Sequence, residues 1–203
     1  GVIAPGSSIT LPASLTRDMQ PGAAISVAVG DYGRLDVAFN NAGYREPNAL
    51  LADQPARDNL EKLYWLLARM GGYTGVLNHM GARFTASAAD FSPIMEELGI
   101  RGLAYLDDGT SNRSVAPQLA RANNVPFARA DAALDTNPAR SAILEALDGL
   151  QTRASERGWA IGTLSALPVS IRTLAEWSAG LDENAYLLVP LSALLTDRLA
   201  QAQ

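Results

Sequence analysis

The sequence contains no cysteine and a single histidine, His79. Without cysteine the chain has no disulfide, no thiolate nucleophile and no zinc site built on thiolates. The absence fits an oxidising compartment, where a free thiol is a liability, but cytosolic proteins can also lack cysteine. The cysteine count therefore does not fix the compartment, and it leaves His79 as the one side chain of the strongest metal-binding types.

The sequence also lacks an excess of basic residues and a long apolar run. Its net charge of −5 argues against a nucleic-acid partner, because neutralising phosphates requires a basic face. No apolar run approaches the roughly 20 residues that a membrane-crossing helix needs. Residues 1–12, GVIAPGSSITLP, show neither a basic region nor a long apolar stretch, so we predict no signal peptide in this chain.

What is present is typical of one globular domain of the α/β class. The 203 residues are 48% hydrophobic and 18% charged, without a linker or repeat, so a single domain over residues 1–203 is expected. Apolar runs predict strands at 24–29, 35–39, 75–77, 102–106, 126–128, 160–164 and 186–189. Helical periodicity predicts helices at 59–70, 91–98, 115–122, 139–157 and 169–179. This alternation is typical of parallel βαβ units, in an open sheet or a barrel.

Polar residues follow four of the predicted strands, where parallel α/β folds gather their ligands. Asp131 and Ser165 follow two of these strands, and the two pairs after the other strands are the richest in chemistry. Asn78 and His79 follow one strand, and Asp107 and Asp108 follow the next. His79 is either a metal ligand or general base, or a histidine that only shapes a loop. Each aspartate either takes part in metal or acid–base chemistry or caps the next helix, and capping is favoured for Asp108. Because neighbours on an extended segment point to opposite sides, the two carboxylates are not expected to share one metal ion.

Other catalytic schemes lack their parts. Residues Tyr32–Gly43 resemble the Asn-Asn-Ala-Gly turn of short-chain dehydrogenases, but the residue four positions before the sole lysine, Lys62, is Asp58. The Tyr-x-x-x-Lys pair of that chemistry is therefore missing. The sequence also contains no Gly-x-Ser-x-Gly elbow and no phosphate loop of the Walker type. Polar residues at the strand ends remain the best candidates for a site.

From about Asn48 to Leu195 the sequence resembles the divergent polysaccharide deacetylases, a bacterial envelope family. The matching segments are NHMGARFTAS (78–87), LDDGTSNRSVAPQLA (106–120), VPFARAD (125–131), AIGTLSALPVSI (160–171) and LLVPLSAL (187–194). The resemblance implies a deformed β/α barrel of mostly parallel strands and a location in the periplasm or cell envelope. It also implies kinship with esterases in which a divalent metal polarises an acetamido carbonyl and activates water.

The family's metal site, as the resemblance implies it, draws on an Asp-Asp pair, a histidine before a Pro-Met-Glu-Pro-like turn, and the histidine of the Asn-His-Met-Gly segment. Only the last maps here, onto His79. Ala4-Pro5 stands where the acidic pair belongs, and Asn40 and Asn41 lie where the second histidine is expected. A neutral amide is a poor zinc ligand. We therefore expect no bound cofactor and no ordinary metal-dependent deacetylase activity.

Two functions are compatible with a cleft formed by the polar residues at the ends of the predicted strands. The first is a degenerate domain that binds a polysaccharide or peptidoglycan-type glycan, or regulates an envelope protein, without cleavage. Its binding groups would be Asn78, Arg83 and Asp108 beside His79 and Asp107, with Tyr105 (or Tyr32 or Tyr44) stacking on a sugar face.

The second is an active deacetylase or hydrolase of an acetylated polysaccharide with a rebuilt site. His79 and Asp107 would be its catalytic residues, with Asp31 or Glu46 joining them around zinc or another divalent metal. A third function needs no cleft: a protein-interaction domain that regulates an envelope enzyme through an exposed apolar patch.

Overall fold

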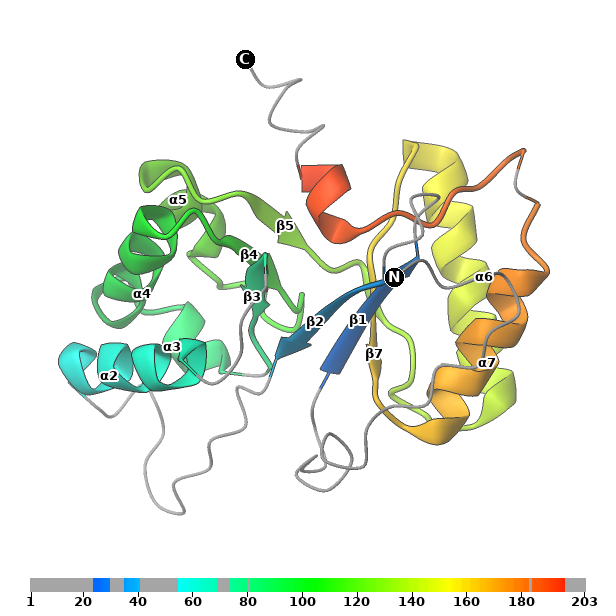
Figure 1. The fold of residues 1–203 in the computed structure, drawn as a ribbon, viewed down its shortest axis with the longest axis horizontal. Coiled ribbons are helices and arrows are strands. Elements are labelled where there is room, and N and C mark those ends of the chain that lie inside the picture. The colour runs from blue at the N-terminus through cyan, green and yellow to red at the C-terminus, as the bar shows by residue number, and fades with distance from the viewer. Residues whose placement is uncertain are drawn as a thin grey trace.

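The computed structural model describes residues 24–29, 35–40, 55–68, 74–79, 81–182 and 184–195. They form a mixed α/β fold whose elements are, in chain order, β1 (Ala24–Val29), β2 (Leu35–Asn40), α2 (Ala56–Leu67), β3 (Gly75–Leu77), α3 (Ala82–Thr85), α4 (Ala88–Ile100), β4 (Ala104–Asp107), α5 (Ala116–Ala122), β5 (Phe127–Arg129), β6 (Ala132–Ala133), α6 (Arg140–Arg157), β7 (Gly162–Ser165) and α7 (Pro168–Ala179). Figure 1 shows α2, α4 and α5 beside β3, β4 and β5, and α6 and α7 beside β7. The expected α/β class is confirmed.

The described strands lie in two sheets. One has the order β3-β4-β5 and is parallel throughout. The other has the order β2-β1-β7-β6, in which β6 and β7 are parallel and β1 is antiparallel to both its neighbours. The strands thus pair mostly in parallel, as expected. The closed barrel that the resemblance implies is not formed by the strands the structure describes.

The chain passes from one sheet to the other at Ala130 and Asp131. The backbone N–H of Ala130 donates to the carbonyl of Asp107 (2.8 Å), at the end of β4. The next N–H, that of Asp131, donates to the carbonyl of Ile161 (2.7 Å), just before β7. Two successive residues are therefore hydrogen-bonded to different sheets, and the segment between β5 and β6 is the junction between them.

The antiparallel pairing of β1 and β2 departs from the expected parallel pattern. β1 ends at Val29 and β2 begins at Leu35, and these two residues are partners in the register. A parallel pair needs a crossover of about a dozen residues or more, which this connection does not contain. The short connection therefore forces an antiparallel hairpin.

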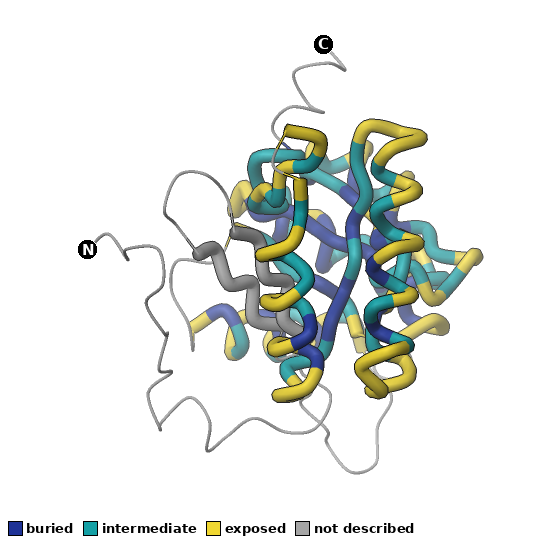
Figure 2. The backbone as a smooth tube through the Cα atoms, turned by 90° about the vertical axis from the view of Figure 1, so that its right-hand side faces the viewer, coloured by how far each residue is buried: buried dark blue, intermediate teal, exposed yellow. Residues whose placement is uncertain are grey.

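Burial is concentrated in three clusters of apolar residues. The first packs α2, α4 and α5 around Phe91, Met95 and Leu98. The second lies along β3, β4 and β5, and the third joins α6 to β7 through Leu147 and Leu164. Figure 2 shows the buried residues along the strands and the exposed ones on the outer turns of the helices. Apolar burial of this kind is the main favourable term in folding.

One predicted strand is wrong. Residues 186–189 are not a strand, and the side chain of Leu187 is 65% exposed. Pro190, which follows directly, has no N–H to give to a ladder, and residues 191–195 are helical.

The short elements α3 and β6 were not predicted. Among the described residues no helix combines the length and apolar character needed to cross a membrane.

Candidate functional site

Two residues that the sequence places after neighbouring strands are in contact. The side-chain Oδ1 of Asn78, just past β3, accepts a hydrogen bond from the backbone N–H of Asp108, just past β4 (2.9 Å). This bond ties the end of one strand to the turn that follows the next. His79 is exposed beside it.

Both strand-end carboxylates are engaged by their own loop. Asp107 is 1% exposed; its Oδ1 accepts from the backbone N–H of Gly109 (2.8 Å) and its Oδ2 from the hydroxyl of Ser114 (2.6 Å). Asp108 Oδ1 accepts from the backbone N–H (2.9 Å) and the hydroxyl (2.7 Å) of Thr110. Neither carboxylate caps the next helix, because α5 has Val115 at its N-cap and no side-chain cap hydrogen bond. The capping favoured for Asp108 is therefore wrong, and both carboxylates instead hold the loop of residues 108–114 from within.

The donor set for a divalent metal can be tested against these contacts. Within the part of the chain that the structure describes, no three His, Cys, Asp or Glu side chains come together. His79 is exposed, and both oxygens of Asp107 face their own loop. The other positions named above lie outside the described residues: residues 4–5, Asp31, Tyr32, Asn41, Tyr44 and Glu46. The described residues alone therefore do not fit a metal ion.

Tyr105 is a core residue, which corrects the expectation that it stacks on a sugar. Its side chain is 3% exposed, and its ring lies edge-on to Phe91 (centroids 5.3 Å apart) and stacked with Phe127 (6.4 Å). Its hydroxyl is buried without a hydrogen-bond partner. Burial, with the nearby carboxylates of Asp107 and Asp108, raises the pKa of Tyr105. A ligand has no access to this ring because aromatic neighbours cover it.

Arg83 belongs to a shallow hollow of about 540 Å³. The hollow is lined by Ala82, Arg83, Ala86, Ser87, Asp90, Ser111 and Arg113. Ser111 and Arg113 lie in the loop of residues 108–114, so this hollow borders that loop. Arg83 is exposed there.

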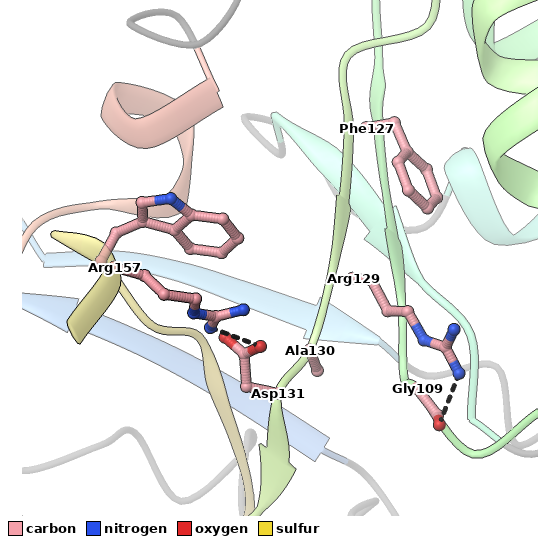
Figure 3. Close-up of a pocket in the computed structure, with 7 residues that line it drawn as sticks. Gly109, Phe127, Arg129, Ala130, Asp131 and Arg157 are labelled. Atoms are coloured by element: carbon pink, nitrogen blue, oxygen red, sulfur yellow. Dashed lines mark hydrogen bonds and ion pairs between the residues drawn. The ribbon is translucent and has the colours of Figure 1, made fainter. Parts of the chain in front are cut away.

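A second hollow, of about 420 Å³, opens where the chain passes between the sheets, and we call it the junction pocket (Figure 3). It is lined by Gly109, Phe127, Arg129, Ala130, Asp131, Arg157 and Trp159. Phe127 and Arg129 stand at alternate positions of β5, so their side chains share one face, and Asp131 lies at the bend that precedes β6. Ala128, between them, is fully buried on the other face. A ring, a cation and an anion from this one short segment thus line the same hollow.

Asp131 and Arg157 form an ion pair in the junction pocket. Asp131 Oδ1 lies 2.7 Å from Arg157 Nη2, and Asp131 Oδ2 accepts from the backbone N–H of Ile161 (2.8 Å). The Arg157 guanidinium carbon also lies 4.7 Å from the centroid of the Trp159 ring, over its face. Arg157 is therefore held between a carboxylate and an indole.

Arg129 occupies the other side of the pocket. Its Nη2 donates to the carbonyls of Gly109 (3.0 Å) and Ser111 (2.9 Å), which fixes the loop against β5. Figure 3 shows Arg157 paired with Asp131 on one side and Arg129 beside Gly109 on the other. The pocket thus presents two guanidinium groups and one carboxylate next to aromatic surface.

Sequence reasoning singled out neither Arg129 nor the Arg157–Trp159 pair. A signal was present: Phe-x-Arg-x-Asp alternation at the end of a strand, and an Arg-Gly-Trp turn at the end of a helix. Gly158 has a φ of 81°, in the left-handed region that favours glycine at helix ends. That turn ends α6 between Arg157 and Trp159, whose side chains both reach the pocket.

Comparison with known proteins places the chain in a family. The model of the family described as divergent polysaccharide deacetylase matches residues 38–195, which include the whole junction pocket. The crystal structure of an uncharacterised protein from Agrobacterium tumefaciens C58 is similar, with a TM-score of 0.70 and 36% identity over 76% of this chain. The alignment spans 63% of that protein's length. A search of curated proteins finds no match. The chain belongs to the divergent polysaccharide deacetylase family.

Proposed function

We propose that the chain binds a glycan of the bacterial cell envelope in the junction pocket without hydrolysing it by metal-dependent chemistry. The observation that carries the proposal is the lining of this pocket. Trp159 and Phe127 offer apolar ring surface, and Arg129, Arg157 and Asp131 offer hydrogen-bonding groups held in place by neighbours. A hollow with apolar surface and a few oriented polar groups is the usual form of a small-molecule site. The envelope location rests on the family.

The state of the strand-end residues supports binding over cleavage. A general base needs a free lone pair within hydrogen-bond reach of the proton that it takes. Asp107 is buried and accepts from Gly109 and Ser114, and Asp108 accepts twice from Thr110. These carboxylates are better placed to hold the loop that borders the pocket than to act on a substrate.

Calorimetry with chitotetraose and with soluble peptidoglycan fragments tests the proposal. We expect binding that falls about tenfold, or roughly 1.4 kcal/mol, in Trp159→Ala. Trp65→Ala is the matched control, because Trp65 is 46% exposed on α2 and does not line the pocket. Trp159→Phe keeps a ring and should retain most of the affinity, which separates loss of the ring from loss of the fold.

Two results would contradict the proposal. One is the absence of binding to any of these glycans by the folded chain. The other is release of acetate from the same glycans on addition of zinc, with turnover lost in His79→Ala. That second result would replace glycan binding by an active deacetylase with a rebuilt site.

A further inference from the structure

The junction pocket is cationic in a chain that is acidic as a whole. The net charge of the chain is −5, yet among the described residues lining the pocket two are arginines and one is an aspartate. A third arginine lies close by, because Arg153 Nη1 donates to the backbone carbonyl of Asp131 (2.7 Å). A local field opposite in sign to the net charge attracts an anion.

Arg129 keeps donors available for that anion. A guanidinium has five N–H donors in a planar fork, and Arg129 uses only Nη2, towards two neutral carbonyls. No carboxylate in the described part of the chain forms an ion pair with it, whereas Arg157 has Asp131. Its charge is therefore not balanced by a contacting acid, and its Nε and Nη1 N–H groups remain to donate a charge-assisted hydrogen bond to a carboxylate.

The loop after β4 holds Arg129 in position. Gly109 has a φ of 77°, and a Cβ added there would lie 2.6 Å from the carbonyl oxygen of Ala130. Only glycine lets this loop approach β5 closely enough for the carbonyls of Gly109 and Ser111 to accept from Arg129. A side chain fixed before the ligand arrives loses little entropy on binding, which favours affinity.

We infer that the junction pocket selects a glycan unit that carries a carboxylate. Arg129 binds the carboxylate through the N–H groups that Nε and Nη1 keep. Arg157, held by Asp131 and Trp159, supplies the second positive charge, and the aromatic rings contact the sugar. The inference rests on the proposed function and adds the chemical class of the sugar.

The test compares two ligands that differ at one carboxyl group: the disaccharide of N-acetylglucosamine and N-acetylmuramic acid, whose lactyl group carries a carboxylate, and its uncharged methyl ester. Calorimetry at low salt should show the acid binding at least tenfold more tightly than the ester, with a smaller ratio at high salt. Arg129→Gln should bring the ratio close to one. Arg129→Lys, which keeps the charge but loses the guanidinium that is anchored to the carbonyls of Gly109 and Ser111, should give an intermediate ratio.

Arg121→Gln is the control for charge alone. Arg121 is exposed on α5 and does not line the pocket, so its removal should leave the ratio unchanged. Equal binding of acid and ester by the native chain overturns the inference, and the proposed function then stands if chitotetraose still binds. An acid preference that survives Arg129→Gln also overturns it. Failure to bind chitotetraose, peptidoglycan fragments and both disaccharides overturns the inference and the proposed function together.

Discussion

Two aspartates near the carboxyl ends of neighbouring strands meet very different surroundings. Asp107 ends β4 and is 1% exposed, with both oxygens bonded inside its own loop. Asp131 follows β5 and faces the junction pocket, paired with Arg157 from the end of α6. The segment that follows each residue explains the difference. After Asp107 comes a loop with Gly109 at positive φ, which curls back onto the carboxylate, whereas β6 starts directly after Asp131.

The comparison shows that a place at a strand end does not by itself make a carboxylate part of a site. A loop that returns its own N–H and hydroxyl groups satisfies the hydrogen-bond acceptors of the carboxylate, as Asp107 illustrates. After Asp131 the chain continues as β6, and the carboxylate pairs with Arg157 from the end of α6. Both side chains line the junction pocket.

The largest effect is expected when Asp107 is removed. Asp107→Ala leaves the N–H of Gly109 and the hydroxyl of Ser114 without their buried acceptor. Hydrogen bonds to a charged group contribute about 1.5–3 kcal/mol each, so we expect the free energy of unfolding to fall by about 3 kcal/mol. Urea denaturation followed by circular dichroism measures this change.

Asp131→Ala is the matched change on the other side of the comparison. It removes the acceptor of the Ile161 N–H and the partner of Arg157, whose side chain is 43% exposed, so water replaces most of the lost ion pair. We therefore expect a loss of about 1.5 kcal/mol, mainly from the one hydrogen bond. Equal losses for the two variants would break the comparison. So would a stable Asp107→Ala variant that no longer binds glycan, because it would make Asp107 a ligand-binding residue.

Gly109 belongs to both regions, because its N–H donates to Asp107 and it also lines the junction pocket. Its replacement should have an intermediate effect on stability. In Gly109→Ala the new Cβ meets the carbonyl oxygen of Ala130 at 2.6 Å, and alanine is strained at a φ of 77°. Backbone strain of this kind costs about 1–3 kcal/mol. We expect a loss near 2 kcal/mol in thermal unfolding, with weaker glycan binding because the loop carbonyls move away from Arg129.

Gly149→Ala is the control for the substitution itself. Gly149 lies inside α6, and nothing lies within 4 Å of a Cβ added there. Alanine in a helix interior is more favourable than glycine by about 0.5–1 kcal/mol, so this variant should be more stable than the native chain. If both variants moved stability in the same direction, the close approach at Gly109 would not be the cause of its effect.

Local patterns were enough to predict most of the secondary structure and the position of Asn78 and Asp108 at the ends of neighbouring strands. Helical periodicity and apolar runs are properties of short segments, and parallel strands bring their carboxyl ends to one edge. The Arg157–Asp131 pair could not be predicted in this way. It depends on where α6 ends relative to β5, which only the tertiary packing sets. The same holds for the antiparallel placement of β1 beside β7.

The position of Tyr105 shows the limit most clearly. A tyrosine on a strand that ends in a polar turn is as compatible with a ligand face as with a core. Which face α4 covers decides between them, and here Phe91 of α4 packs on the ring. The sequence alone contains no signal that orients the helix over that side of β4.

The smallest effect is expected from Tyr105→Phe, which tests whether the region around Asp107 is closed to ligands. The hydroxyl of Tyr105 is buried without a partner, so its removal should stabilise the fold by up to about 1 kcal/mol at pH 7. Burial and the Asp107 and Asp108 carboxylates raise its pKa, so the folded chain retains this proton above pH 10, where the unfolded chain releases it. The stability of the native chain should therefore fall as pH rises beyond about 10, more steeply than that of the variant. Urea midpoints of both proteins between pH 7 and pH 11 measure the difference, since the other tyrosines are common to both. A variant less stable than the native chain at pH 7 would mean that the hydroxyl is bonded, and that the region around Asp107 is open to a polar group rather than sealed by its own loop.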